Sequence, residues 1–254
     1  MKRVLFIGGT DPCGGAGLQA DLRTATAFKV WGLSVVTAVV VQNTSRVSSI
    51  SSVGSEVLEA QLESVVEDIV FDAIKIGMIA SLENLEVVRV FIKKQRHLPI
   101  VLDPIYFDGS GETRLASDLL FKKMLGALGE NVSIITPNSK EALAWEEGDL
   151  VEVLQRLHAY GPDVLLKSGH LDSKNRDYIF DYWCDKEGIK ELKAYPRKDV
   201  DPRGTGCHLA SAIACGLAQG KTPIEAVEEA RKWLASKFQN GLISIGQGRP
   251  LIGN

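Results

Sequence analysis

Short apolar runs alternate along this chain with longer segments in which apolar residues recur every three or four positions. The short runs are rich in Val and Ile and bounded by Gly, Pro, Asp or Asn, which is typical of buried strands. They cover residues 4–7, 35–41, 73–76, 100–102, 133–135 and 164–166. The longer segments have the period of amphipathic helices and cover residues 16–28, 56–69, 82–94, 116–128 and 150–159. The alternation predicts an α/β fold with a central, mostly parallel β-sheet flanked by helices on both faces.

Two segments break this alternation. Residues 45–53 hold single apolar residues among serines, which is expected of an edge strand or a flap. Residues 178–183 and 190–195 are expected to form an antiparallel pair that turns at residues 185–188. Because no long linker, low-complexity segment or internal repeat is present, residues 1–254 are expected to form a single domain.

Glycines and unusual polar residues follow each predicted strand. These segments are residues 8–17, 42–44, 77–78, 103–104, 136–138 and 167–170. The carboxyl ends of parallel strands meet at one edge of a sheet, and ligands of open α/β folds bind there. Each segment alone would be an ordinary turn, but together they predict one binding site.

A Gly-Thr-Gly sequence precedes a helical pattern that runs on through Gly216. Gly204, Thr205 and Gly206 allow a tight turn, and the first turn of the helix adds unpaired N–H donors and the positive end of its dipole. This combination predicts an anion site, most often for phosphate. Cys207 lies in the same positive field, which predicts a shift toward thiolate and suggests phosphoryl transfer to a hydroxyl. The plainer alternative is a glycine turn before a core helix with a buried cysteine.

Two acidic residues follow predicted strands and suit a magnesium site. Asp103 and Glu141 offer the hard oxygen ligands that Mg²⁺ prefers, partly through water. Asn138 lies one helical turn before Glu141, and both could instead cap a helix. Lys167 at a buried strand end needs a partner, for which a nucleotide phosphate is suitable.

Other glycine motifs are less specific. Residues 8–17 do not fit the dinucleotide-binding fingerprint, and they could form a turn that Asp11 caps locally or bring backbone close to a small ligand. Asp21, in the first turn of the next helix, could bind a ligand amine or hydroxyl. Residues 216–222 resemble a phosphate-binding loop but are better explained as the end of one helix, followed by a capping box that starts the next.

Composition narrows the partners and the compartment. The chain of 254 residues has a net charge of −3 and a pI near 5.9, so it has no basic footprint for nucleic acid or an anionic membrane. Its four cysteines include no CxxC pair, which argues against zinc and disulfides and suits a reducing cytosol. No apolar run is long enough to span a membrane. A cytoplasmic protein acting on small molecules is expected.

Seven ordered motifs carry a resemblance to a known family, between about residue 4 and residue 240. They are Gly9-Thr10-Asp11-Pro12-x-Gly14-Gly15-Ala16-Gly17-x-Gln19-Ala20-Asp21, Thr37-Ala38-x-x-x-Gln42-Asn43-Thr44, Lys75-Ile76-Gly77-Met78, Leu102-Asp103-Pro104, Ile135-Thr136-Pro137-Asn138-x-x-Glu141-Ala142, Lys167-x-Gly169-His170 and Gly204-Thr205-Gly206-Cys207. In these motifs the chain resembles the hydroxymethylpyrimidine/phosphomethylpyrimidine kinases of thiamine biosynthesis, in the ribokinase-like superfamily.

The resemblance implies ATP, Mg²⁺, a homodimer and two successive phosphorylations. The acceptor would be 4-amino-5-hydroxymethyl-2-methylpyrimidine and then its monophosphate. The pyrimidine would be surrounded by Gly9, Asp21, Gln42, Met78 and Ile105. By the same resemblance, Asp103 and Glu141 would lie near magnesium, Asn138 and Lys167 near the nucleotide, and Gly204, Thr205, Gly206 and Cys207 at the transferring group.

The chain departs from the family pattern at several positions. Tyr106 and Asp108, in the 105–111 run, put the acceptor pocket and the second phosphorylation in question. Arg203 adds a positive charge that would favour a phosphorylated acceptor. Three other functions stay open: a pyridoxal kinase, a non-catalytic pyrimidine sensor and, more distantly, a nicotinamide-dependent oxidoreductase.

Overall fold

The computed structural model describes residues 1–108, 113–168 and 177–253. Within these ranges nine strands form one sheet in the order β10-β9-β7-β6-β5-β4-β1-β2-β3. Their bounds are β1 Arg3–Gly9, β2 Trp31–Gln42, β3 Val47–Ser52, β4 Ala73–Ile76, β5 Ile100–Leu102, β6 Ile134–Ile135, β7 Asp163–Leu166, β9 Tyr182–Asp185 and β10 Gly188–Glu191. The six strands from β7 to β2 are parallel, whereas β3 and β9 run antiparallel to their neighbours.

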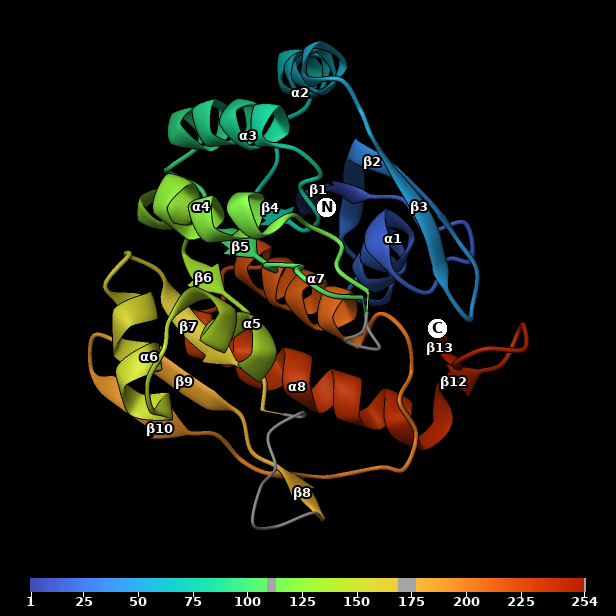
Figure 1. The fold of residues 1–254 in the computed structure, drawn as a ribbon, viewed down its shortest axis with the longest axis vertical. Coiled ribbons are helices and arrows are strands. Elements are labelled where there is room, and N and C mark those ends of the chain that lie inside the picture. Colours follow the sequence, from blue (N-terminus) through green and yellow to red (C-terminus); the bar gives the residue numbers. More distant parts are fainter. Residues whose placement is uncertain (109–112, 169–176, 254) are drawn as a thin grey trace.

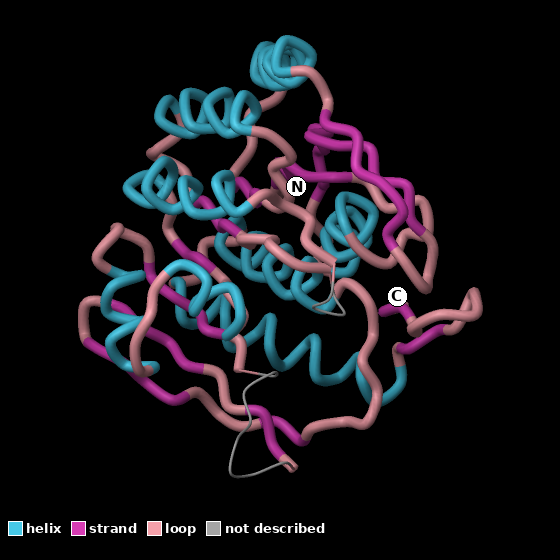
Figure 2. Tube along the Cα trace, in the orientation of Figure 1, coloured by secondary structure: helices cyan, strands magenta, loops and turns pink. Residues whose placement is uncertain are grey.

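Helices cover both faces of this sheet (Figures 1 and 2). Their bounds are α1 Gly17–Ala27, α2 Ser55–Asp68, α3 Leu82–Lys94, α4 Asp118–Leu128, α5 Ser139–Trp145, α6 Leu150–His158, α7 Thr205–Ala218 and α8 Pro223–Asn240, with a 3₁₀ turn at Gly129–Asn131. Helices α2 to α6 pack into one hydrophobic core, and α1, α7 and α8 pack into the other. The predicted mostly parallel sheet with helices on both faces is confirmed.

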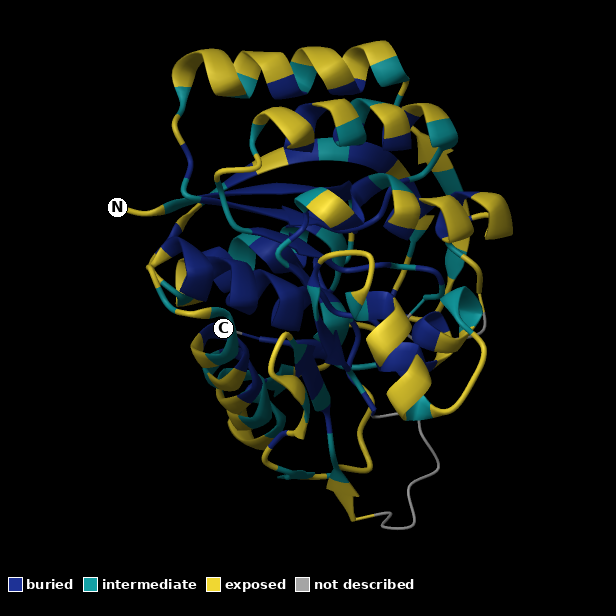
Figure 3. Ribbon diagram, turned by 90° about the vertical axis from the view of Figure 1, so that its left-hand side faces the viewer, coloured by how far each residue is buried: buried dark blue, intermediate teal, exposed yellow. Residues whose placement is uncertain are grey.

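Strand β1 shows why both faces are covered. Side chains alternate along a strand, so Leu5 and Ile7 enter the first core while Val4 and Phe6 enter the second. All four are fully buried. In Figure 3 the inner strands of the sheet are buried, whereas the outer helices are exposed on their solvent side. The edge strand β3 has no buried residue.

The segments that break the alternation fold somewhat differently from the prediction. The serine-rich segment forms β3, the edge strand paired with β2, as expected. The predicted pair 178–183 and 190–195 is wrong in its boundaries, because the hairpin is interrupted. Strand β9 pairs with β10 in the main sheet, whereas β8 (Tyr178–Ile179) pairs with β11 (Tyr195–Pro196) in a separate ribbon. The C-terminal ribbon, β12 (Leu242–Ile243) with β13 (Leu251–Ile252), was not predicted.

Residues 216–222 are helix punctuation, as predicted. Helix α7 ends at Ala218, Gly220 has a φ of 89°, and Thr222 forms a capping box with Glu225 at the start of α8, where Pro223 is the first residue. No helix in the described ranges is long and apolar enough to cross a membrane.

Candidate active site

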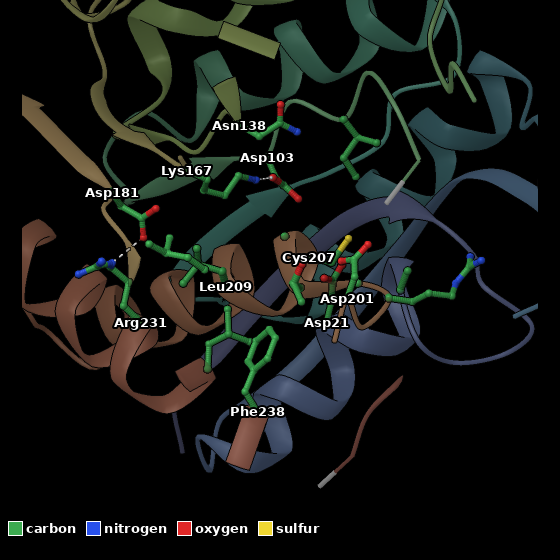
Figure 4. Close-up of a pocket in the computed structure, with 18 of the residues that line it drawn as sticks. Asp21, Asp103, Asn138, Lys167, Asp181, Asp201, Cys207, Leu209, Arg231 and Phe238 are labelled. Carbon is green, nitrogen blue, oxygen red and sulfur yellow. Dashed lines mark hydrogen bonds and ion pairs between the residues drawn. The ribbon is translucent and has the colours of Figure 1, made fainter. Parts of the chain in front are cut away.

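A cavity of about 1270 Å³ lies at the carboxyl ends of the parallel strands. It extends from the β2 and β4 ends of the sheet to helix α8, and Figure 4 shows part of its lining. Every predicted site residue lines this one cavity: Gly9, Asp21, Gln42, Met78, Asp103, Ile105, Asn138, Glu141, Lys167, Gly204, Thr205, Gly206 and Cys207. The parallel topology therefore brings together side chains that are far apart in sequence.

The Gly-Thr-Gly turn starts α7 in the geometry of an anion site. Gly204 is the N-cap residue with a φ of 75°, and a Cβ atom there would lie 1.9 Å from the carbonyl oxygen of Gly15. Only glycine fits that position. A Cβ on Gly206 would lie 3.3 Å from Nζ of Lys167, so the first turn of α7 lies directly against a cation. The free N–H groups of this turn and the lysine form one positive surface.

The glycine-rich loop after β1 is shaped by Asp11. This buried carboxylate accepts hydrogen bonds from the N–H groups of Cys13, Gly15 and Ala16 at 2.8–3.0 Å. Local capping by Asp11 is thus confirmed. The capped loop also places the Gly15 carbonyl against Gly204, so the two glycine loops support each other at the rim of the cavity.

Asp103 and Lys167 form an ion pair across the ends of β5 and β7 (Figure 4). Nζ of Lys167 lies 3.1 Å from Oδ1 of Asp103, which also accepts a hydrogen bond from the Thr136 hydroxyl at 3.1 Å. Burial alone would raise the pKa of Asp103, but Lys167 and Lys75 outweigh burial and hold that pKa below its usual value. Asp103 is therefore a carboxylate at neutral pH.

Asn138 and Glu141 form a capping box at the start of α5. The Asn138 side chain accepts from the Glu141 N–H at 2.9 Å, and the Glu141 carboxylate accepts from the Asn138 N–H at 2.8 Å. Helix capping is thus confirmed, although both side chains also line the cavity. Burial raises the pKa of Glu141 to about 7; Lys167 opposes the shift and Asp103 adds to it.

The donor set at this edge suits Mg²⁺ bound partly through water. Within the described residues, no group of three or more His, Cys, Asp or Glu side chains could hold a metal ion. Asp103 is close enough to Glu141 that its charge raises the pKa of Glu141. Two hard-oxygen ligands beside the predicted phosphate site fit Mg²⁺, which takes its remaining ligands from water and phosphates.

The predicted thiolate character of Cys207 is wrong for the free protein. Burial raises the pKa of this thiol to about 12; Lys75 lowers it, whereas Asp103 and Asp21 raise it further. Desolvation at a site that is 8% exposed outweighs the positive field of the helix start. Cys207 is a protonated thiol at neutral pH.

Lys75 was quoted only as part of a motif, and the structure gives it a central place. Its ammonium bonds both carboxylate oxygens of Asp21, at 3.0 and 3.1 Å, beneath the cavity. Ser211 on α7 donates a further hydrogen bond to Asp21 at 2.7 Å, so β4, α1 and α7 meet at one ion pair. The sequence signal was a lysine inside an otherwise apolar strand, which requires a buried anion.

The part of the cavity in which the pyrimidine was predicted to bind has an apolar wall on one side and polar groups on the other. Met78 packs with Val40 and Ile105 in a small cluster between β2 and the loop after β5. Gln42, at the end of β2, is held by Thr10 and Arg203. A flat, largely apolar ring with a few polar groups fits such a surface.

Tyr106 does not enter the acceptor pocket. Its ring stacks on Phe121 with 4.2 Å between centroids, and its hydroxyl donates to Asp118 at 2.5 Å. The question about Tyr106 is thus resolved by its place in the core, while Asp108 does line the cavity. Residues 109–111 of the same run, as well as Gly169 and His170, lie outside the described residues.

The end of the cavity near α8 was not predicted from the sequence. Arg231 of α8 and Asp181 form a buried ion pair at 2.8 Å, and Figure 4 shows it at the opposite end from Cys207. Residues of the 193–201 segment, including Lys193 and Arg197, line the same end. Their alternation of charged and apolar residues resembles an ordinary surface segment, and only the packing of α8 against the sheet makes it part of a cavity.

His208, behind the site, is a buried histidine that should make stability depend on pH. Thr24 donates its hydroxyl proton to the Ala20 carbonyl, so Nδ1 of His208 donates to the Thr24 oxygen at 2.7 Å. The buried Nε2 has no partner among the described residues. Burial lowers the pKa of His208 to about 3, and Arg23, Lys75 and Lys237 add to the shift. The unfolded chain therefore binds this proton first, with a pKa near 6.5, and stability is lost as the pH falls below that value.

We expect His208→Gln to reduce this acid sensitivity. Between pH 7 and pH 5 the free energy of unfolding should fall by about 2 kcal/mol more in the parent than in the variant, from the 1.36 kcal/mol that corresponds to one pKa unit. Urea unfolding at the two pH values measures the difference. Equal losses in both proteins would show that His208 does not titrate between them.

Comparison with known proteins defines first the class of this protein. The crystal structure of phosphomethylpyrimidine kinase from Clostridium difficile 630 superimposes with a TM-score of 0.81 at 32% identity, covering 94% of this chain and 100% of that one. The pyridoxal kinase of Staphylococcus aureus in complex with pyridoxal gives a TM-score of 0.85 at 27% identity, covering 99% and 93%. The same kinase has been solved with AMP-PCP. The fold is that of the ribokinase-like kinases.

Sequence comparison then defines the family. The family model for phosphomethylpyrimidine kinase matches residues 11–251. The hydroxymethylpyrimidine/phosphomethylpyrimidine kinase of Escherichia coli K12 is 36% identical over 260 residues, covering 98% of this chain and 96% of that protein. The chain spans about a third, 34%, of the thiamine biosynthesis multifunctional protein ThiED of Corynebacterium efficiens, at 34% identity. The chain belongs to the phosphomethylpyrimidine kinase family.

Proposed function

We propose that this protein uses ATP to phosphorylate 4-amino-5-hydroxymethyl-2-methylpyrimidine and then its monophosphate, giving the diphosphate for thiamine biosynthesis. The observation that carries the proposal is the cavity itself, in which a helix-start anion site and the Asp103–Lys167 pair meet an apolar, ring-sized wall. A protein that only senses pyrimidines would need the apolar wall but not an anion site or a buried ion pair beside it. The presence of the anion site and of the Asp103–Lys167 pair therefore favours an enzyme.

The acceptor is held at the Met78 end of the cavity. Met78, Ile105 and Gly9 form the faces against which the ring lies, and Gln42 presents its amide to the ring edge. Asp21 is engaged by Lys75 and Ser211, so it acts as a fixed negative charge beneath the ring's amino and hydroxymethyl groups. Positioning of this kind supplies most of the catalysis in phosphoryl transfer.

The transferring phosphoryl group meets the start of α7. The N–H groups of Gly204, Thr205 and Gly206 bind its oxygens, and Lys167 neutralises their charge. Asn138 would contact the nucleotide beside Lys167. Asp103 and Glu141 would hold Mg²⁺, which when bound neutralises phosphate charge. Cys207, in the same turn, lies where the acceptor hydroxyl gives up its proton.

A second candidate acceptor is pyridoxal. The pyridoxal kinases of Staphylococcus aureus share this fold, and pyridoxal is also a flat heteroaromatic ring with a hydroxymethyl group. The residues of the apolar wall do not by themselves separate the two rings. We rank pyridoxal below the pyrimidines because the family model describes phosphomethylpyrimidine kinases and the Escherichia coli relative is a kinase of the same kind.

The deciding experiment measures ADP release with Mg²⁺ and ATP in the presence of each acceptor separately. We expect turnover with hydroxymethylpyrimidine and with its monophosphate, and little with pyridoxal. Product masses confirm one and two added phosphoryl groups. Tight pyrimidine binding without ADP release would make the protein a sensor, and turnover with pyridoxal alone would make it a pyridoxal kinase.

We further propose that the protein works as a single-domain, cytoplasmic homodimer. The continuous sheet supports one domain, and the four cysteines, all free in the structure, suit a reducing compartment. The homodimer rests on the family resemblance. Sedimentation of the purified protein tests it directly.

A further inference from the structure

Among the described residues, Arg203 is a buried cation without an anionic partner. Its side chain lines the cavity and the residue is 8% exposed, yet no carboxylate of the described chain forms an ion pair with it. Nη1 donates to the Asn43 carbonyl at 2.9 Å and Nη2 to the Gln42 amide oxygen at 2.5 Å. The buried Nε has no hydrogen-bond partner in the part of the chain that the structure describes. A guanidinium has five N–H donors, so besides the buried Nε one N–H on each Nη nitrogen remains for a ligand.

Such an arrangement is costly unless an anion completes it. Burial of a charge is unfavourable when it is paired only with neutral oxygens. The two other cations near Cys207 differ in this respect, because Lys75 is paired with Asp21 and Lys167 with Asp103. A planar guanidinium fits phosphate oxygens in a bidentate manner. The free donors of Arg203 therefore suit a phosphate group that enters the cavity.

The backbone places this guanidinium between the two halves of the acceptor site. Arg203 immediately precedes the Gly204 turn, and its own N–H donates to the Pro250 carbonyl at 2.9 Å. Its side chain reaches the end of β2 at Gln42. A phosphate attached to a ring held against Gln42 and directed toward Gly204 would pass beside Arg203.

We propose that Arg203 binds the phosphate of a phosphate-monoester acceptor and so determines specificity for the second phosphorylation. The proposal rests on the proposed function above. In that second step a phosphate oxygen of the monoester attacks the γ-phosphorus of ATP. A new P–O–P linkage forms, the bond to ADP breaks, and ADP leaves with its electron pair. In the first step the acceptor is an uncharged alcohol, which places no phosphate beside Arg203.

A purely structural role for Arg203 makes a different prediction. If Arg203 only holds Gln42 and Asn43 in place, its replacement would lower kcat/KM for both acceptors alike, because the ring contacts the same wall in both steps. If Arg203 binds the acceptor phosphate, its replacement would lower kcat/KM mainly for the monophosphate. The ratio of kcat/KM for the two acceptors therefore separates the roles.

The test compares Arg203→Met and Arg203→Lys with the parent on both pyrimidines. We expect Arg203→Met to lower kcat/KM for the monophosphate about 10- to 100-fold more than for the alcohol, as the loss of charged hydrogen bonds would, because the lost contact with Gln42 affects both acceptors alike. Arg203→Lys, which keeps the charge, should recover part of the loss. Equal losses on both acceptors, or no loss on the monophosphate, would overturn the proposal.

A matched control is Arg249→Met. Arg249 is paired with Asp201 at 2.6 Å and donates to the carbonyls of Asp201 and Pro202, next to Arg203, but it does not line the cavity. Its replacement should leave the ratio of kcat/KM for the monophosphate and the alcohol unchanged. A ratio that shifts equally in both variants would trace the effect to this region of the backbone rather than to the Arg203 charge.

Calorimetric binding without ATP gives a readout that is independent of turnover. The ratio of the affinities for the monophosphate and for the alcohol should be higher in the parent than in Arg203→Met. Turnover on neither pyrimidine by the parent would refute the proposed function. Turnover on both with an unchanged ratio in Arg203→Met would refute the Arg203 proposal alone. A parent active only on the alcohol would end this proposal and the second half of the function.

Discussion

Replacing Cys207 with alanine is expected to lower kcat on hydroxymethylpyrimidine by roughly 10²- to 10⁴-fold, the usual contribution of a positioned acid–base group. The thiol lies in the first turn of α7, beside the N–H groups that we propose bind the transferring phosphate. It does not belong to the apolar wall that we propose holds the ring. Pyrimidine binding, measured by calorimetry, should therefore stay close to that of the parent.

The raised pKa of Cys207 adds a pH signature to this prediction. A group that accepts a proton is active when deprotonated, and burial raises the pKa of this thiol to about 12. If Cys207 is the base, kcat of the parent rises with pH through the alkaline range, and this rise disappears in Cys207→Ala. A rise that persists in the variant would assign the titration to another group.

Cys215→Ala is the matched control. Cys215 is a fully buried cysteine on the same helix, two turns further along, and it does not line the cavity. Its replacement also removes a buried sulfur, so it reproduces the packing loss without touching the site. We expect nearly parental kcat for Cys215→Ala. A Cys207→Ala variant with parental kcat would make that thiol a helix-start bystander.

Replacing Lys75 with methionine is expected to destabilise the protein by about 3–5 kcal/mol, the usual effect of removing one partner of a buried ion pair. The ammonium of Lys75 and the carboxylate of Asp21 are both almost completely buried. Methionine fills much of the same volume but leaves Asp21 as an uncompensated buried charge. Burial already raises the pKa of Asp21, and without Lys75 that pKa should rise further. Urea unfolding at neutral pH measures the loss.

Two further variants separate the buried charge from packing. Adding Asp21→Asn to Lys75→Met removes the charge left behind, so the double variant should be more stable than Lys75→Met alone. Lys2→Met breaks the exposed pair with Asp72, in which Lys2 is 52% exposed, and should cost at most about 1 kcal/mol. An equal loss of unfolding free energy in Lys2→Met and Lys75→Met would contradict the prediction that the buried pair contributes more to stability than the exposed one.

Much of the architecture could be predicted because local patterns carry it. Buried parallel strands such as β4 and β5 are short runs of apolar residues between turn residues, and periodicity detects them without knowledge of their neighbours. The sequence predicted the boundaries of the interrupted hairpin around β8 and β9 less accurately. Its break depends on which strand joins the main sheet, and that is decided by pairing between distant segments.

The residues of the candidate site were predicted from their place at strand ends and in family motifs, but their charge states were not. A helix start beside Cys207 predicts a thiolate, and a solvated cysteine there would follow the prediction. The tertiary structure buries this thiol and places Asp103 and Asp21 nearby, so desolvation and like charge reverse the sign. The cost of desolvation depends on what surrounds a residue in three dimensions.

By itself the sequence determined the α/β alternation, the edge of the sheet at which ligands collect, the glycines of the Gly204 turn and the membership of a kinase family. These follow from local conformational preferences, from the alternation of side chains along strands and from motif order. Only the tertiary structure decided that Lys75 neutralises Asp21, that Tyr106 lies in the core and that Arg203 is buried with neutral oxygens as its hydrogen-bond partners. Each depends on burial and on distances between residues far apart in the chain, which no local pattern records.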